Sequence, residues 1–151
     1  MTKIILLNHS PGAVGLRYLG LGPMLKPSRG LKKLQRLFDR HAFWARGRSY
    51  KQLRQLLSGS DAVVSVWKGK RLVGFGRATS DGFSRAVLWD IVVAGDLQGN
   101  GLGRMVVEAL LHTPKVVGIE RVYLMTTNSE GFYRQLGFEK EESQKLLVLK
   151  R

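Results

Sequence analysis

The stretch Ala86-Val-Leu-Trp-Asp-Ile-Val-Val93, followed after a short gap by Gln98-Gly-Asn-Gly-Leu-Gly-Arg104, decides the fold of this chain. The first part is an almost continuous apolar run that a single carboxylate, Asp90, interrupts, which is typical of a strand covered on both faces. After the glycines, apolar residues recur at the spacing of one helix face: Leu102, Met105, Val106, Ala109 and Leu110. The sequence therefore predicts a buried strand, a glycine-rich loop and an amphipathic helix in direct succession.

Residues Gln98–Arg104 have the composition of a site for a phosphate-bearing ligand. Glycines let the backbone turn tightly and come close to a ligand, because they carry no Cβ atom. The helix that begins here adds unpaired N–H groups and the positive end of its dipole, and Arg104 adds a formal charge. A P-loop would need Lys and Ser or Thr where Arg104-Met105 stand, and a dinucleotide fingerprint would need glycine in place of Val106. The residues alone therefore leave two alternatives, a pyrophosphate site of another type and a glycine-rich turn without a ligand.

Two helices are expected in the first part of the chain, after the loop Asn8–Gly30, which is rich in glycine and proline. The first has an apolar stripe at Leu31, Leu34, Leu37 and Phe38. Ser49 can cap the second, which ends at Ser58-Gly59. The residues of this second helix that are predicted to face inward are Tyr50, Leu53, Leu56 and Leu57.

Further strands are predicted on both sides of the central stretch, from short runs rich in apolar and β-branched residues. They are Ala62–Trp67, Leu72–Thr79, Val122–Met125 and a final strand, Leu146–Leu149, that closes the chain. Residues 68–71 suit a hairpin turn between the first two, and Asp81-Gly82 marks another turn.

A last helix is expected between the two C-terminal strands. Thr127–Glu130 can form a capping box for it, and Phe132 and Leu136 would be its buried residues. Gly137 is a natural left-handed stop, with Phe138 folding back on the preceding turn. The order of elements predicts a single α/β domain over residues 1–151, with helices on the faces of a sheet.

Composition excludes several classes of site and protein. The chain has 151 residues, the length of one ordinary domain, and its apolar opening Ile4–Leu7 is too short for an export signal or a membrane span. Without cysteine there is no disulfide, thiol nucleophile or thiolate metal site. Because His9, His41 and His112 lack metal-ligand spacing, no metal is expected. These features indicate a cytosolic or organelle-interior protein.

The formal net charge of +14 is unevenly distributed. Residues 26–54 hold ten Lys and Arg residues and one acidic residue, Asp39. Such a segment can bind nucleic-acid phosphates, steer an anionic ligand or form a solvated helical face, and charge alone does not decide among these.

Two motifs resemble signatures of the GNAT superfamily of N-acyltransferases. Gln98-x-x-Gly101-x-Gly103 after an apolar strand is similar to its acyl-CoA pyrophosphate motif, and Thr127-Asn128 followed by Phe132-Tyr133-Arg-Gln-Leu-Gly137-Phe138 resembles its second signature. The similarity extends from about Ala62 to the C-terminus. It implies a GNAT-type α/β fold: a mixed, mostly antiparallel central sheet flanked by helices, with a splayed strand pair that holds CoA.

More narrowly, three stretches look like the cyanobacterial and plastid branch associated with serotonin N-acetyltransferase, which also acetylates protein lysines. They are Arg77-Ala-Thr-x-Asp81-Gly82, Trp89-Asp90-Ile-Val-Val93 and Phe132-Tyr133-x-x-Leu136-Gly137-Phe138. The chain departs from that branch at Asn128–Gly131, where many plastid members carry a more charged turn beside the acetyl end of the site. The resemblance implies a location in a cyanobacterial-type cytosol or the plastid stroma.

The resemblance also assigns a co-substrate, acetyl-CoA, and the residues that bind it. These are Ile91, Val92, Val93, Gln98, Gly99, Asn100, Gly101, Leu102, Gly103, Arg104, Asn128, Phe132 and Tyr133. Backbone N–H groups near Val92 and Val93 would polarise the thioester carbonyl. Asn128 would bind the pantetheine arm or, alternatively, cap the helix that follows it.

The family implies direct attack of a neutral amine, and Asp90 and Tyr133 are the expected base and acid. A carboxylate within an apolar strand is poorly hydrated, which makes it a stronger base, and it can act directly or through water. The alternative is an ion pair with an arginine such as Arg77. The Tyr133 phenol is protonated at neutral pH and can donate to a thiolate, unless it is only a packed aromatic. Trp89 is expected in the core or, together with Asp90, at the wall of the substrate pocket.

The sequence thus predicts an acetyl-CoA-dependent N-acetyltransferase without a metal, acting on a primary amine such as the arylalkylamine serotonin. A protein lysine or N-terminal acetyltransferase is the alternative within the same class. A basic nucleic-acid-binding module on this fold is the alternative from another class, disfavoured because binding alone would need neither Asp90 nor Tyr133. A homodimer is left open, and neither a nucleic acid nor a membrane is expected as a partner.

Overall fold

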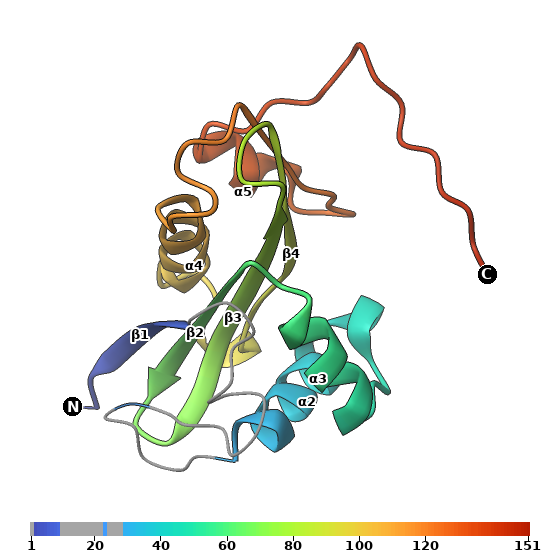
Figure 1. The fold of residues 1–151 in the computed structure, drawn as a ribbon. Coiled ribbons are helices and arrows are strands. Elements are labelled where there is room, and N and C mark those ends of the chain that lie inside the picture. Colours follow the sequence, from blue (N-terminus) through green and yellow to red (C-terminus); the bar gives the residue numbers. More distant parts are fainter. Residues whose placement is uncertain (1, 10–22, 24–28) are drawn as a thin grey trace.

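One five-stranded sheet organises the molecule (Figure 1). The computed structural model describes residues 2–9, 23 and 29–151. The strands follow chain order across the sheet: β1 (Ile4–His9), β2 (Ala62–Lys68), β3 (Arg71–Ser80), β4 (Arg85–Val93) and β5 (Arg121–Tyr123). Neighbouring strands are antiparallel from β1 to β4, whereas β5 is parallel to β4. The predicted α/β class and mixed, mostly antiparallel sheet are confirmed.

Helices cover both faces of this sheet. Figure 1 shows α2 (Gly30–His41) and α3 (Tyr50–Ser58) on one side and α4 (Leu102–Leu111) on the other, with α5 (Glu130–Gln135) beyond the end of α4. Two short 3-10 turns, η2 (Phe43–Ala45) and η3 (Gly95–Leu97), follow α2 and β4. The predicted apolar stripe of α2 is buried, and Ser49 and Gln52 form a complete capping box for α3.

The close packing of α4 on the sheet requires glycine in β3. A Cβ atom at Gly76 would lie 2.5 Å from Val106 Cγ1 and 2.8 Å from Ile91 Cδ1. Val106 and Leu110 of α4 are themselves fully buried. A side chain at position 76 would therefore push the helix away from the sheet, and the helix carries the loop before it.

The start of α5 differs from the prediction. Ser129 stands at the helix N-cap without a side-chain cap, and Thr126 Oγ1, rather than Thr127, accepts a hydrogen bond from the Ser129 N–H. The expected capping box is wrong because the helix begins at Glu130, so that Ser129, two residues after Thr127, is the N-cap and Glu130 stands at the first helical position instead of the third. The end of α5 is as predicted: Gly137 has φ 97°, and the Phe138 N–H donates to the Tyr133 carbonyl.

Two helix faces are narrower than predicted, since Tyr50 of α3 is 41% exposed and Met105 of α4 is 37% exposed. Strand β1 was not predicted from its sequence, because its short apolar run stops at Asn8. Most of the predicted loop Asn8–Gly30, and Lys26 of the basic segment, lie outside the described residues.

The predicted closing strand Leu146–Leu149 is wrong for the single chain. These residues form no regular secondary structure, and their side chains are 65–88% exposed. Figure 1 shows the C-terminal segment running away from the sheet. A run of β-forming residues makes a strand only when a neighbouring strand offers its hydrogen-bonding groups, and the chain does not bring this run to one.

A buried polar network links β1 to β2. His9 Nε2 lies 2.7 Å from Ser65 Oγ, which also accepts a hydrogen bond from Trp67 Nε1 at 2.8 Å. Ser65 and Trp67 are fully buried, and burial lowers the pKa of His9 below its usual 6.5. The folded network therefore holds a neutral imidazole.

This network makes stability depend on pH. As the pH falls below about 6.5, the unfolded chain binds a proton at His9 before the folded chain does, so stability falls in that range. We expect the free energy of unfolding to drop by about 1 kcal/mol between pH 7.5 and pH 5.5, measured by urea titration. In His9→Gln, which cannot titrate, most of this drop should disappear. An equal drop in both proteins would assign the effect to other groups.

Candidate functional site

Strands β4 and β5 separate soon after they meet. They pair only from Arg85↔Arg121 to Val87↔Tyr123, whereas β4 continues to Val93. Beyond Val87, the edge of β4 that faces β5 has no strand partner among residues 2–9, 23 and 29–151. The backbone N–H and C=O groups that point to this side can bind an extended ligand, as expected for a splayed strand pair, except for the Val93 carbonyl, which accepts a hydrogen bond from Gln98 Nε2.

A bulge in β4 turns Asp90 out of the regular strand alternation. Asp90 has φ 54°, a left-handed conformation that is uncommon for any residue but glycine, and the β3–β4 register shifts between Phe75 and Arg77. Strained backbone of this kind gathers at functional sites. The bulge places the Asp90 carboxylate on the side of the sheet that α2, η2 and α3 cover, because its contacts come from there.

The Asp90 carboxylate is surrounded by donors. Arg77 Nε donates to it at 2.8 Å, Trp44 Nε1 at 3.0 Å and Arg48 Nη1 at 3.4 Å, and the Asp90 side chain is only 5% exposed. Of the two alternatives, the ion pair with Arg77 is therefore present. These donors supply the hydrogen bonds that a buried carboxylate needs.

Two exposed aromatic rings lie beside this carboxylate, and sequence reasoning missed them. Phe43 and Trp44 of η2 are 57% and 47% exposed, and their rings meet edge to face at 5.1 Å. Trp44 and Arg48 reach Asp90 only because η2 and the segment leading into α3 fold over β4. No pattern of neighbouring residues in the sequence predicts these contacts. Trp89 is partly buried, donates from Nε1 to Thr79 Oγ1 at 2.9 Å, and lies under the Arg77 guanidinium.

The glycine-rich loop joins β4 to α4 as predicted. Gly99 and Gly101 have φ 83° and 82°, and a Cβ atom on either would meet no atom within 4 Å, so both border open space. Gln98 Nε2 donates to the Val93 carbonyl and Asn100 Nδ2 to the Leu97 carbonyl, which fixes the loop by its own side chains. The first N–H groups of α4, from Leu102 onward, therefore follow a loop whose glycines border open space.

Arg104 is oriented differently from the expectation that its charge serves the loop. It is exposed and pairs with Glu108 at 2.8 Å, one turn along α4. Asn128 is exposed and accepts a weak hydrogen bond from Ser129 Oγ at 3.4 Å, which is not the predicted helix cap. Its amide group remains available to a ligand on the solvent side.

Gly103 brings the two signature motifs together. A Cβ atom there would lie 3.1 Å from Phe132 Cζ, so the absence of a side chain lets the α5 aromatic pack against the first turn of α4. Tyr133 is held edge to face by Phe132 and Phe138, with ring centroids 4.9 and 5.9 Å away. Burial raises the pKa of Tyr133 to about 12, and its hydroxyl makes no hydrogen bond to any residue that the structure describes. A protonated phenol without a partner is a free proton donor.

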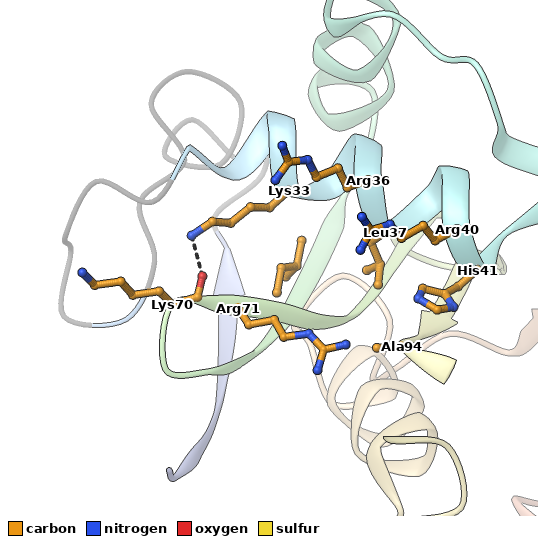
Figure 2. Close-up of a pocket in the computed structure, with 9 residues that line it drawn as sticks. Lys33, Arg36, Leu37, Arg40, His41, Lys70, Arg71 and Ala94 are labelled. Carbon is orange, nitrogen blue, oxygen red and sulfur yellow. Dashed lines mark hydrogen bonds between the residues drawn. The ribbon is translucent and has the colours of Figure 1, made fainter. Parts of the chain in front are cut away.

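A cationic cavity of about 450 Å³ lies between α2 and the turn from β2 to β3 (Figure 2). Its polar lining consists of Lys33, Arg36, Arg40, His41, Lys70 and Arg71. Burial and the nearby charges of Lys70 and Arg29 lower the pKa of Lys33. Sequence reasoning marked the segment as basic, but it could not foresee that a hairpin turn supplies the opposite wall.

Two searches for other kinds of site were negative within the described part of the chain. No cluster of His, Asp and Glu side chains there could hold a metal ion, and no helix there is long and apolar enough to cross a membrane.

Comparisons with known proteins identify the family. Residues 31–138 match the model of the acetyltransferase (GNAT) family. An uncharacterized N-acetyltransferase, ycf52, of Pyropia yezoensis is 34% identical over 116 residues, which are 74% of this chain and 66% of that protein. The chloroplastic serotonin N-acetyltransferase 2 of Oryza sativa subsp. japonica is 38% identical over 96 residues, 60% of this chain and 48% of that protein. The match thus spans about two thirds or less of these relatives.

A solved structure supports the same fold. The GNAT family acetyltransferase of Streptococcus pneumoniae TIGR4 superimposes with a TM-score of 0.71 and 22% identity, covering 99% of each chain. Its similarity bears on the fold alone. The family match covers β2–β5, the glycine-rich loop and α5, and we conclude that this chain belongs to the GNAT family of acetyltransferases.

Proposed function

We propose that the protein transfers the acetyl group of acetyl-CoA to a primary amine, most readily an arylalkylamine such as serotonin. The observation that carries the proposal is the combination of three features, of which the second and third are joined by the contact between Gly103 and Phe132. They are the edge of β4 beyond Val87, the left-handed loop before α4, and a Tyr133 hydroxyl that makes no hydrogen bond to a described residue. Residues of this set fit acetyl-CoA: the loop suits a pyrophosphate and the strand edge suits the pantetheine amides.

Bound acetyl-CoA would supply an activated thioester. Transfer forms a C–N bond and breaks a C–S bond, so a proton must leave the amine and another must reach the thiolate. Backbone N–H groups at Ile91–Val93 would stabilise the charge that develops on the carbonyl oxygen. Tyr133 would donate its proton to the sulfur.

The acceptor side favours an aromatic amine. Phe43 and Trp44 offer exposed ring faces within one residue of the Asp90 contact, and stacking on such rings is favourable for an indole. The carboxylate itself would attract the ammonium form of the amine. The relative from rice that is named for serotonin supports the same acceptor class. A lysine side chain on a protein is the second candidate, since its aliphatic amine needs no aromatic wall.

The test is CoA release measured with a panel of arylalkylamines and basic peptides, using wild type and Phe43→Ala. Phe43 touches Trp44 and not Asp90, so its removal leaves the carboxylate in place. We expect KM for the arylalkylamines to rise about 10-fold in the variant, with KM for acetyl-CoA unchanged. Turnover of peptides alone, unaffected by the substitution, would favour protein acetylation. Absence of turnover with every amine would reject the proposal.

The role of Asp90 can be separated from that of its ion pair. Asp90→Asn leaves Arg77 and Arg48 without a charged partner, so we expect both a stability loss of about 2 kcal/mol and a fall in kcat/KM. If Asp90 accepts the amine proton, the fall should be largest at low pH, where few amines are already neutral.

Arg77→Gln is the matched variant for this question. It removes the 2.8 Å partner and keeps the carboxylate. If Asp90 is the base, Arg77→Gln should retain much of the wild-type activity, because the carboxylate is still present. If Asp90 only positions Arg77, both Asp90→Asn and Arg77→Gln should lose activity. Urea titration of each variant measures its free energy of unfolding independently of the kinetics.

A further inference from the structure

The apolar segment at the C-terminus, Lys145–Arg151, is not covered by its own chain. Leu146, Leu147, Val148 and Leu149 are 69%, 88%, 65% and 81% exposed. Successive residues of a strand point to opposite faces, so a strand formed here is apolar on both. Strands of that kind belong inside a sheet whose two faces are covered. Figure 1 shows the segment extended away from the body of the molecule, so another surface must receive it.

Strand β5 offers such a surface. It is the last strand of the sheet and pairs on one side only, with β4, so its other side presents unpaired N–H and C=O groups in the described structure. Met125, two residues after β5, adds an apolar side chain that is 48% exposed. The segment starts near this edge, because Glu141 pairs with Arg121 at 3.5 Å, but its apolar part leads elsewhere.

We propose that Lys145–Arg151 of one copy forms a strand on the free edge of β5 of a second copy, and that reciprocal exchange makes a homodimer. Strand addition satisfies the backbone groups of both partners, and a twofold axis lets each chain give and receive the same segment. Charge supports a second copy as the occupant. The segment carries Lys145, Lys150 and Arg151, whereas Glu141 lies beside the receiving strand, 3.5 Å from Arg121, and has Glu139 and Glu142 close to it in the sequence.

The exchange would also support the active site. The chain runs directly from β5 to α5, which holds Tyr133, and β5 itself has only three residues. A strand added on the free side of β5 would make β5 more rigid, and with it the segment that positions Tyr133. This consequence, unlike the dimer itself, rests on the proposed function.

Cysteine cross-linking tests the proposal, because the chain has no cysteine of its own. Met125→Cys is combined with Leu147→Cys in one variant and with Val148→Cys in another, since these tail residues face opposite sides of a strand. We expect one of the two variants to give a covalent dimer on a non-reducing gel, because a disulfide forms only when Cα atoms approach to about 4.4–6.8 Å. Met125→Cys with Lys51→Cys on the exposed face of α3 is the control and should stay monomeric. A disulfide closed within one chain, or none in either variant, would overturn the proposal.

Light scattering after size exclusion gives an independent readout. We expect wild type and Lys150→Gln to be dimers, and the chain ending at Gln144 to be a folded monomer by circular dichroism. A monomeric wild type at about 50 μM, where strand exchange of nM to μM affinity would be complete, argues against the exchange. Neither measurement involves turnover, so loss of the dimer and loss of the proposed acetyl transfer are told apart.

The cationic cavity of Figure 2 carries a second, independent inference. Its walls hold the segment that leads into the glycine-rich loop. His41 Nδ1 accepts a hydrogen bond from the Gly95 N–H at 3.2 Å, and Arg71 binds Asp96 through two hydrogen bonds of 2.6 and 2.8 Å. Gly95 and Asp96 form η3, which ends one residue before Gln98.

We infer that this cavity binds a small molecule that carries phosphate groups, and that its occupancy changes the affinity for acetyl-CoA. Four cationic side chains besides Arg71 line the space: Lys33, Arg36, Arg40 and Lys70. Arg71 is already paired with Asp96, and none of the lining residues is acidic. A compact anion of several charges fits 450 Å³ better than a nucleic-acid backbone, which needs a long surface. A ligand that draws Arg71 from Asp96 would release η3 and the loop behind it.

Inorganic tripolyphosphate is the probe, with Tm measured in about 150 mM salt, where weak surface attraction is screened. We expect a saturable rise in Tm for wild type and for the control Arg46→Gln/Arg54→Gln, whose residues do not line the cavity. The rise should be lost in Arg36→Gln/Arg40→Gln, which removes both charges that α2 contributes through these arginines. The Kd of acetyl-CoA should change several-fold when the probe saturates. An equal rise in both double variants, or simple competition with acetyl-CoA, would overturn the inference.

Discussion

Replacing Tyr133 with phenylalanine should lower kcat roughly 10²-fold, the usual scale for a lost proton donor, while acetyl-CoA binding stays nearly intact. The substitution removes one oxygen and keeps the ring that packs between Phe132 and Phe138. Because the hydroxyl makes no hydrogen bond to a described residue, its loss leaves no protein group unpaired and should cost little stability. The kinetic loss is therefore chemical and is measured as kcat under saturating acetyl-CoA.

The pH profile sharpens this prediction. Burial raises the pKa of Tyr133 to about 12, so the phenol stays protonated well above the pH at which an ordinary tyrosine ionises. We expect kcat of wild type not to decline between pH 8 and pH 10. Tyr123→Phe, which alters a tyrosine on β5 under Arg85, is the control and should leave kcat close to wild type. Full activity of Tyr133→Phe would show that water or another group protonates the thiolate.

The succession of strand, loop and helix could be predicted because each part has a local cause. Apolar residues of β4 and α4 recur at the spacing of their own element, and Gly99, Gly101 and Gly137 stand where the backbone turns left-handed. Such features depend on neighbours in the sequence. The resemblance to GNAT signatures then assigned them to a family, and the family match confirms that assignment.

The surroundings of Asp90 could not be predicted in the same way. Its partners come from three places in the chain: Trp44 from η2, Arg48 from the loop between η2 and α3, and Arg77 from β3. They meet only after η2 and α3 fold over the sheet. Only Arg77 was foreseeable, because it lies on the neighbouring strand. The C-terminal segment shows the opposite case. Its composition predicts a strand, but the described structure has none there, because strand formation also needs an edge that its own chain does not bring to it.

A negative charge at Gly101 should abolish acetyl-CoA binding. Gly101 has φ 82°, stands at the N-cap of α4 and borders open space on the side where a pyrophosphate would lie. Acetyl-CoA should raise Tm of wild type, since a ligand that binds only the folded state stabilises it. Gly101→Asp should lose this rise, because a carboxylate would take the place of the phosphate at the helix N-terminus and repel it. Thermal melting with and without acetyl-CoA measures the effect.

Two variants separate charge from backbone strain. The side chain in Gly101→Asn has the same size as the one in Gly101→Asp, and Asn tolerates the left-handed conformation as well as Asp does. Gly101→Asn should therefore keep part of the Tm rise. Gly82→Asp places the same residue at φ 80° in the turn between β3 and β4, and it should keep the full rise. Equal loss in the Asp and Asn variants at position 101 would mean that space, and not charge, governs the loop. If wild type responds to ATP or NAD instead of acetyl-CoA, the loop binds a different phosphate ligand and the proposed activity is wrong.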